Sequence, residues 1–252
     1  MASNARKTCL LVLFFLTQQV LAQNVTPLID LAKQQRWEEL SLLLEDGLNP
    51  NVIYGDGTTA LHWASYHDNK NATNALLTAG ANVDSTTDLG VTPLWLAAQN
   101  GNLDLVNTLL SAGADPTIPL LSGETPMMTA AQAGNGAVVK VMLEAGADPN
   151  VSVTRDQTAL MWAADRGHSD VVAALLEHGV DIEARSLVRE QYVKSEKEQD
   201  SHPSYKYWIE QGGNTALMFA ARSGDLRSTE LLIEAGSNVN SVSAFGTSPV
   251  IM

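Results

Sequence analysis

Apolar and polar residues follow a pattern that returns along most of the chain. Each copy is a hexad that starts with threonine, continues with proline or alanine and three mostly apolar residues, and ends with alanine. The hexads begin at Thr59, Thr92, Thr125, Thr158 and Thr215. The starts lie 33 residues apart up to Thr158, and the last step is longer by 24 residues. A second marker, an apolar pair followed by glycine, keeps the same phase at Gly47, Gly80, Gly113, Gly146, Gly179 and Gly236. Two markers with one period predict a repeat array with units that start at residues 26, 59, 92, 125, 158 and 215, a partial unit at 248, and an insertion at about 187–211.

The residues within one unit predict two short helices. The threonine supplies an oxygen for the free amides at the start of the first helix, and a proline such as Pro93 suits the first helical position. Alanine pairs such as Ala97-Ala98 keep the first helix thin, while the second helix carries larger apolar residues. Glycine ends the second helix, since it adopts the left-handed conformation cheaply. One unit cannot bury a core alone, so we expect stacked units.

The 33-residue period and the motif T-P-L-H-x-A together resemble the ankyrin-repeat family, from Thr26 to the end of the chain. The resemblance implies an all-α solenoid of stacked helix-turn-helix units joined by β-hairpin-type loops. His62 occupies the family's histidine position, which commonly makes a bond between repeats. In the other units the equivalent position is not histidine, so this bond is expected at few of the junctions. The residues at that position are Ile29, Trp95, Met128, Met161, Met218 and Ile251.

The first 22 residues have the features of a signal peptide. Arg6 and Lys7 are followed by an apolar run from Cys9 to Leu16 and then by Ala22, which suits cleavage before Gln23. The run is too short to span a bilayer, which requires about 20 residues, although an uncleaved anchor is the alternative. We therefore expect a periplasmic or secreted protein that has no membrane span after cleavage.

Composition and charge exclude several classes of function. The chain carries 28 acidic and 15 basic residues, a net charge of -13, which disfavours binding to nucleic acid. The single cysteine, Cys9, excludes a disulfide framework and a cysteine-rich zinc site. Motifs of serine hydrolases, P-loop nucleotide-binding proteins, zinc proteases and EF-hands do not occur in the sequence. We therefore expect no catalytic residue, no cofactor and no metal, and a non-enzymatic role.

The resemblance places partner binding on the concave surface, formed by the hairpin tips and the ends of the first helices. Eight candidates map to these positions: Tyr66, His67, Asp88, Leu89, Gln99, Asn100, Arg155 and Arg166. The insertion adds the aromatic residues Tyr192, Tyr205, Tyr207 and Trp208, which suit an interface. Local packing and a tolerated surface loop are the alternatives for the insertion. Trp63, Trp162 and Phe219 share one first-helix position and are interpreted as core between units.

These features predict a protein–protein interaction module or scaffold whose partner is another protein. One alternative is the non-catalytic part of a longer enzyme or multidomain protein. The other is a receptor that holds a peptide or small ligand in the concave groove. The sequence ends at Met252 within the first helix of the partial unit, and we expect the natural product to continue or this chain to be a fragment.

Overall fold

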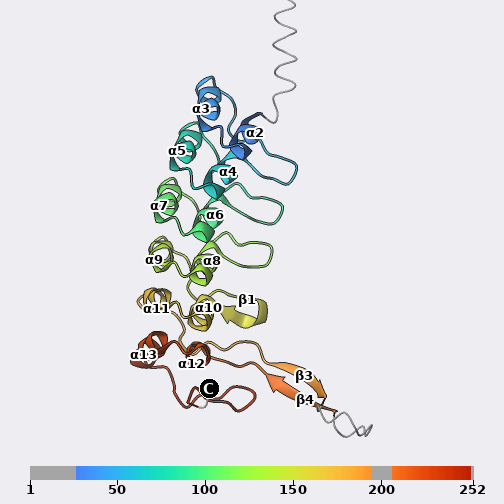
Figure 1. The fold of residues 1–252 in the computed structure, drawn as a ribbon, viewed down its shortest axis with the longest axis vertical. Helices are drawn as coiled ribbons and strands as arrows, with labels where there is room; N and C mark the ends of the chain where they lie inside the picture. The colour runs from blue at the N-terminus through green and yellow to red at the C-terminus, as the bar shows by residue number, and fades with distance from the viewer. Residues whose placement is uncertain (1–26, 195–205, 251–252) are drawn as a thin grey trace, which may run out of the picture.

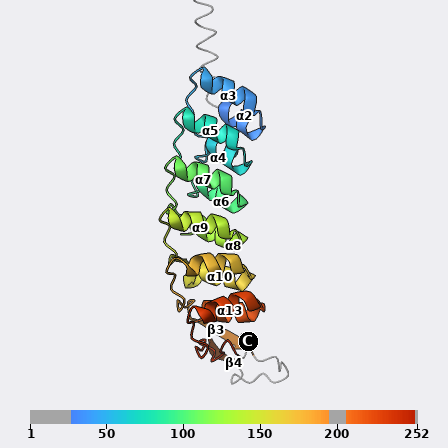
Figure 2. The ribbon, with the colours of Figure 1, turned by 90° about the vertical axis from the view of Figure 1, so that its left-hand side faces the viewer.

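A computed structural model describes residues 27–194 and 206–250, and in these residues the helices form a single stack. Figure 1 shows the first helices in one column, the second helices in another, and the connecting hairpins on the side away from the second helices. The first helices are α2 (Pro27–Lys33), α4 (Ala60–Tyr66), α6 (Pro93–Asn100), α8 (Pro126–Ala133), α10 (Ala159–Arg166) and α12 (Ala216–Ser223). The second helices, stacked in Figure 2, are α3 (Trp37–Glu45), α5 (Lys70–Thr78), α7 (Leu103–Ser111), α9 (Gly136–Glu144), α11 (Ser169–Leu176) and α13 (Leu226–Glu234). The predicted solenoid of helix pairs is therefore confirmed.

The first helices begin where the threonines predict. The side chains of Thr59, Thr92, Thr125 and Thr158 each accept a hydrogen bond from the backbone amide three residues later. Thr215 precedes α12 in the same extended conformation but makes no such side-chain bond. Capping by threonine thus fixes where four of the six described first helices begin.

Alanine allows the first helices to approach closely. Ala97, Ala98, Ala130, Ala131, Ala163 and Ala164 are all fully buried between neighbouring units. The buried side chains form two clusters, one from Leu28 to Leu76 in the first two units and one from Leu94 to Leu232 in the units after them. The core is therefore continuous within each group of units, and the partly buried Leu77 packs against both clusters where the groups meet.

Polar groups join successive units on the hairpin side. The amide of Asp88 donates to the carbonyl of Asp56 at 2.9 Å, and the amide of Leu121 donates to the carbonyl of Leu89 at 3.0 Å. In the turns after the second helices, the side chain of Asn51 accepts from the amide of Asn82 at 2.7 Å. The two backbone bonds fix the hairpins that precede α4, α6 and α8 relative to one another.

The insertion forms a β-ribbon that lengthens one hairpin. Strands β3 (Arg189–Lys194) and β4 (Lys206–Gln211) are antiparallel, with Arg189 opposite Gln211 and Lys194 opposite Lys206. Figure 1 shows this ribbon extending further than the other hairpins on the same side of the stack. The preceding hairpin is short, with β1 (Ser152–Val153) and β2 (Gln157–Thr158) flanking a 3-10 helix, η1 (Thr154–Asp156).

Two predicted segments fall outside the described residues wholly or in part. The predicted signal peptide at 1–22 lies wholly outside the described residues. The partial unit at 248 shows a turn at Pro249 and Val250, and residues 251–252 are outside the described part. Among the described helices, none has the length and hydropathy needed to cross a membrane.

Candidate binding groove between the second and third units

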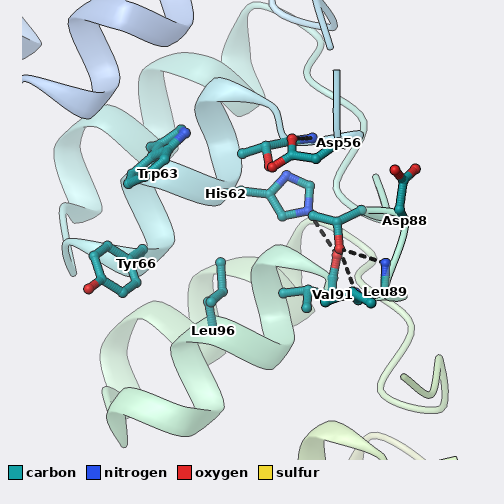
Figure 3. A pocket seen from close by; sticks show the side chains of 10 residues that line it. Asp56, His62, Trp63, Tyr66, Asp88, Leu89, Val91 and Leu96 are labelled. Carbon is teal, nitrogen blue, oxygen red and sulfur yellow. Dashed lines mark hydrogen bonds between the residues drawn. The ribbon is translucent and has the colours of Figure 1, made fainter. Parts of the chain in front are cut away.

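A groove of about 340 Å³ opens on the hairpin side of the stack, between the units that start at residues 59 and 92. Its walls come from α4, from α6 and from the two hairpins that precede these helices, as Figure 3 shows. The residues that line this groove are Asp56, Thr58, His62, Trp63, Tyr66, Thr87, Asp88, Leu89, Val91 and Leu96.

His62 lies at the base of the groove and connects two units. Its Nδ1 lies 3.1 Å from the backbone nitrogen of Thr59, whose N–H donates to it, and its Nε2 lies 2.9 Å from the carbonyl oxygen of Val91 in the next hairpin. A neutral ring with the proton on Nε2 satisfies both bonds. The side chain is 2% exposed, and burial lowers the pKa of His62 below its usual value of 6.5. The bond between repeats that the resemblance implied is therefore present at this junction.

Aromatic side chains form the wall on the α4 side. Trp63 meets Tyr66 edge-on, with ring centroids 5.8 Å apart, and stacks on His67 at 5.9 Å. The ammonium of Lys33 lies 3.8 Å from the centroid of the Tyr54 ring and 5.5 Å from that of Trp63. Tyr66 keeps 53% of its surface exposed, so this wall offers an aromatic surface to a ligand.

Two carboxylates stand at the rim on the hairpin side. Asp56 and Asp88 are both exposed and come from adjacent tips that are joined by the backbone bond described above. Hydrogen bonds from the side chain and the backbone of Thr58 hold the pKa of the Asp56 carboxyl below its usual value. The rim is therefore negative at neutral pH, whereas the walls are mostly apolar.

The predicted candidates separate into those in the groove and those beyond it. Tyr66, Asp88 and Leu89 line the groove, and the ring of His67 packs against Tyr66 at 5.0 Å. Gln99 is exposed at the end of α6. Asn100 is also exposed, but its side-chain amide donates to the backbone carbonyls of Ser65 and Tyr66 at 3.3 and 3.0 Å. Asn100 therefore holds two units together.

The candidates further along the stack are not part of this groove. Arg155 lines a second and more polar hollow of about 600 Å³, between the short hairpin and the base of the ribbon. Asp165 and Arg222 also line it and form an ion pair at 2.6 Å. Arg166 is exposed at the end of α10 and does not line either hollow.

The aromatic candidates of the insertion are placed by the register of the ribbon. Tyr192 of β3 lies opposite Trp208 of β4, and Val193 lies opposite Tyr207. Tyr205 is outside the described residues. Their role in partner binding stays a prediction.

Trp63 has a second role that the sequence analysis did not assign. Its position in the repeat indicated core packing, yet the side chain is only half-buried and lines the groove. Tyr66 lies three residues later on the same helix, so the two side chains are neighbours on its surface. That spacing could have predicted that Trp63 lines the groove beside Tyr66. Within the described residues, no group of three or more His, Cys, Asp or Glu side chains could hold a metal ion.

Comparisons with known proteins agree with this architecture. A family model described as ankyrin repeats (3 copies) matches residues 2–87, 28–120 and 94–186, and one described as ankyrin repeats (many copies) matches residues 160–233. The chain is also similar to the crystal structure of the human ASB11 ankyrin repeat domain. The two share 27% sequence identity at a TM-score of 0.69, over 89% of this chain and 90% of the other. Among curated proteins, no sequence matches this chain.

Proposed function

Since the chain belongs to the ankyrin repeat family, we propose that it works by binding another protein through its concave surface and its inserted ribbon. Ankyrin repeats are generally protein-interaction modules. The observation that carries the proposal is the groove between the second and third units, where Tyr66 and Leu89 are 53% and 66% exposed. Exposed apolar side chains that gather in a hollow are typical of binding sites.

We propose further that the chain is a binding module without catalytic activity. The ankyrin fold is typically non-catalytic. In the groove, His62 uses both ring nitrogens to hold Thr59 and Val91 in place. A histidine committed in this way serves the fold and is not free to exchange protons with a substrate.

We also propose that the protein is exported, and that the partner is met in the periplasm or outside the cell. The support is the sequence alone: Arg6 and Lys7, the apolar run from Cys9 to Leu16, and Ala22. Intact-mass analysis of protein from the exported fraction tests this proposal, with a mature chain that starts at Gln23 as the expected result. A soluble cytoplasmic product that still begins at Met1 would contradict it.

Affinity capture tests the binding proposal directly. The full chain is immobilised, proteins of the envelope and secreted fractions are passed over it, and those retained are identified by mass spectrometry. Leu89→Ser should strongly reduce retention of the partner, because it removes the exposed apolar edge of the groove without adding a charge. Leu226→Ser is the matched control, since Leu226 is 71% exposed at the start of α13, on the other face of the stack. Equal retention by both variants would overturn the proposal that this surface binds.

A further inference from the structure

We propose that the groove between the second and third units binds an arginine side chain, flanked by an apolar residue, from an extended segment of the partner. This inference rests on the proposed function and names the chemistry that the groove recognises. It would make the groove the point at which the chain selects one partner sequence over another.

The charges around the groove favour a cationic ligand. Asp56 and Asp88 stand on neighbouring hairpin tips, which the bond from the Asp88 amide to the Asp56 carbonyl holds 2.9 Å apart at the backbone. Among the ten described residues that line the groove, none is lysine or arginine. Lys33 lies close by, over the Tyr54 ring, so the two carboxylates outnumber the nearest cation. A cationic side chain therefore finds a favourable potential here, and an acidic one is repelled.

The walls of the groove suit the apolar stem of a long basic side chain. Trp63, Tyr66 and Leu96 provide apolar and aromatic surface below the acidic rim. The methylene stem of a long basic residue packs on such a wall while its charged end stays near the carboxylates. Lys33 already places a cation over two aromatic rings, Tyr54 and Trp63, at the neighbouring position. The chain thus uses the same type of contact within its own fold.

The groove suits arginine better than lysine, and its size suits one such side chain with an apolar neighbour. A guanidinium group is planar, so it can stack on an aromatic ring and bridge two carboxylates, which an ammonium does less well. The volume of about 340 Å³ is near the lower end of the range for ligand pockets, roughly 300–1,000 Å³. It suits one long side chain and one apolar neighbour, for which exposed Leu89 supplies a contact.

The test starts from a displayed library of random linear peptides, selected on the full chain. We expect enrichment of peptides in which arginine adjoins an apolar residue. The strongest of these is then synthesised with arginine and with citrulline, its neutral isostere, and both are titrated by fluorescence anisotropy. Citrulline should weaken binding roughly three- to tenfold, the range for a partly exposed charge pair.

A double-mutant cycle locates the effect in the groove. With Asp56→Asn and Asp88→Asn together, the arginine and citrulline peptides should bind equally, because the charges that distinguish them are gone. Asp115→Asn is the matched control. Asp115 is exposed and accepts from the amide of Thr117 at 2.8 Å, just as Asp56 accepts from the amide of Thr58 at 3.0 Å, but it lies outside the groove. This control should preserve the preference for arginine.

The outcomes separate this inference from the proposed function. Enrichment of peptides without a basic residue, no enrichment of any peptide, or a preference for arginine that survives the Asp56 and Asp88 changes would each overturn the inference. The binding proposal is judged separately by capture of a partner with Leu89→Ser and Leu226→Ser. A partner whose capture depends on Leu89 but whose segment carries no arginine would leave the proposed function standing and refute the chemistry assigned to the groove.

Discussion

A single side chain, His62, combines two tasks that other units divide among several residues. It completes the cap of α4 by accepting from the amide of Thr59, and it holds the next hairpin through the carbonyl of Val91. The equivalent positions Met128, Met161 and Met218 are fully or almost fully buried apolar residues. At those positions the contact with the next unit is apolar packing, whereas His62 places a buried titratable link beside the groove.

The link at His62 predicts a pH dependence of stability. The pKa of His62 is lowered from 6.5 by burial, so between that lowered value and 6.5 the unfolded chain binds a proton that the folded chain does not. The free energy of unfolding should therefore be fully maintained above about pH 6.5 and should fall as the pH decreases through that window. Urea unfolding at a series of pH values measures this.

His62→Gln provides the control for the pH prediction. Glutamine suits the third position of a helix that threonine caps, so α4 should still form. Loss of the bond to Val91 should cost about 1 kcal/mol at pH 7, and the slope of the free energy of unfolding against pH below 6.5 should become flatter. An identical pH profile in the variant and the original chain would show that His62 is not the group responsible.

Gly212 predicts a second effect at the scale of one residue. It has a φ of +109° at the base of the ribbon, and a β-carbon there would overlap the carbonyl oxygen of Leu187. Gly224 also has a positive φ, +74°, but a β-carbon at that position would meet no heavy atom within 4 Å. Gly224→Ala should therefore show only backbone strain of about 1 kcal/mol, and Gly212→Ala roughly 1–3 kcal/mol more. Denaturation of both variants under the same conditions measures the difference, and equal losses would contradict it.

At the scale of elements, sequence predicts what depends on local chemistry. Thr59 and Thr92 begin helices and Gly113 ends one with a φ of +91°, because capping and left-handed backbone depend on the residue itself. The strands of the ribbon were not predicted, since the pairing of Arg189 with Gln211 joins segments far apart in a stretch without a repeat. For such a segment, the sequence alone predicts the length of the insertion but not which residues pair across the two strands.

The groove, too, could be predicted from the sequence only in part. Sequence identified Tyr66, Asp88 and Leu89 as exposed positions of the concave surface, because the repeat phase shows where each residue lies within its unit. It did not show that they surround one hollow with Trp63 and Asp56. That arrangement depends on the offset between stacked units, which the bond from the Asp88 amide to the Asp56 carbonyl fixes in three dimensions.

The ribbon is predicted to be separable from the folding of the array. The hairpin closes below the ribbon through bonds from Ser186 to the Asn214 carbonyl at 3.0 Å and from Gly213 to the Ser186 carbonyl at 2.9 Å. Replacing residues 188–210 by a short glycine-containing turn leaves these bonds possible. Circular dichroism should therefore show an unchanged helical signal and a cooperative melt, since loop length alone changes closure entropy little.

Partner capture by the same shortened chain should decrease, because it lacks the aromatic residues of the insertion. A milder variant changes Tyr205, Tyr207 and Trp208 to serine, and loss of one true anchor would cost on the order of 2 kcal/mol, or about thirtyfold in affinity. If the shortened chain unfolds while the serine variant binds normally, the ribbon is a structural element and its proposed role in recognition is wrong.

Two buried clusters meet at the junction that holds the groove, where the partly buried Leu77 packs against both. The buried cluster of the first two units ends at Leu76, and the larger cluster begins at Leu94. On the other face of the stack, an open hollow of about 560 Å³ lies between α5 and α7, and polar residues such as Asn74 and Asn107 contribute to its lining. The second unit also contains Thr73, fully buried, whose hydroxyl has no hydrogen-bond partner among the described residues. An array with nearest-neighbour coupling should open first at such a junction.

Hydrogen exchange followed by mass spectrometry should therefore show α2 to α5 opening at a lower free energy than α8 to α11. Thr73→Val should selectively raise protection of α2 to α5 by about 1 kcal/mol, because it replaces an unpaired buried hydroxyl with a methyl group of similar size. Thr129→Val is the control, since the Thr129 hydroxyl donates to Glu124 at 2.9 Å and its loss should destabilise the chain. A ligand bound in the groove contacts units on both sides of the junction, so it should bring the protection of the two groups closer together. Uniform exchange along the stack in the free chain would show that the units open as one body, and the groove would then lie on a continuous core.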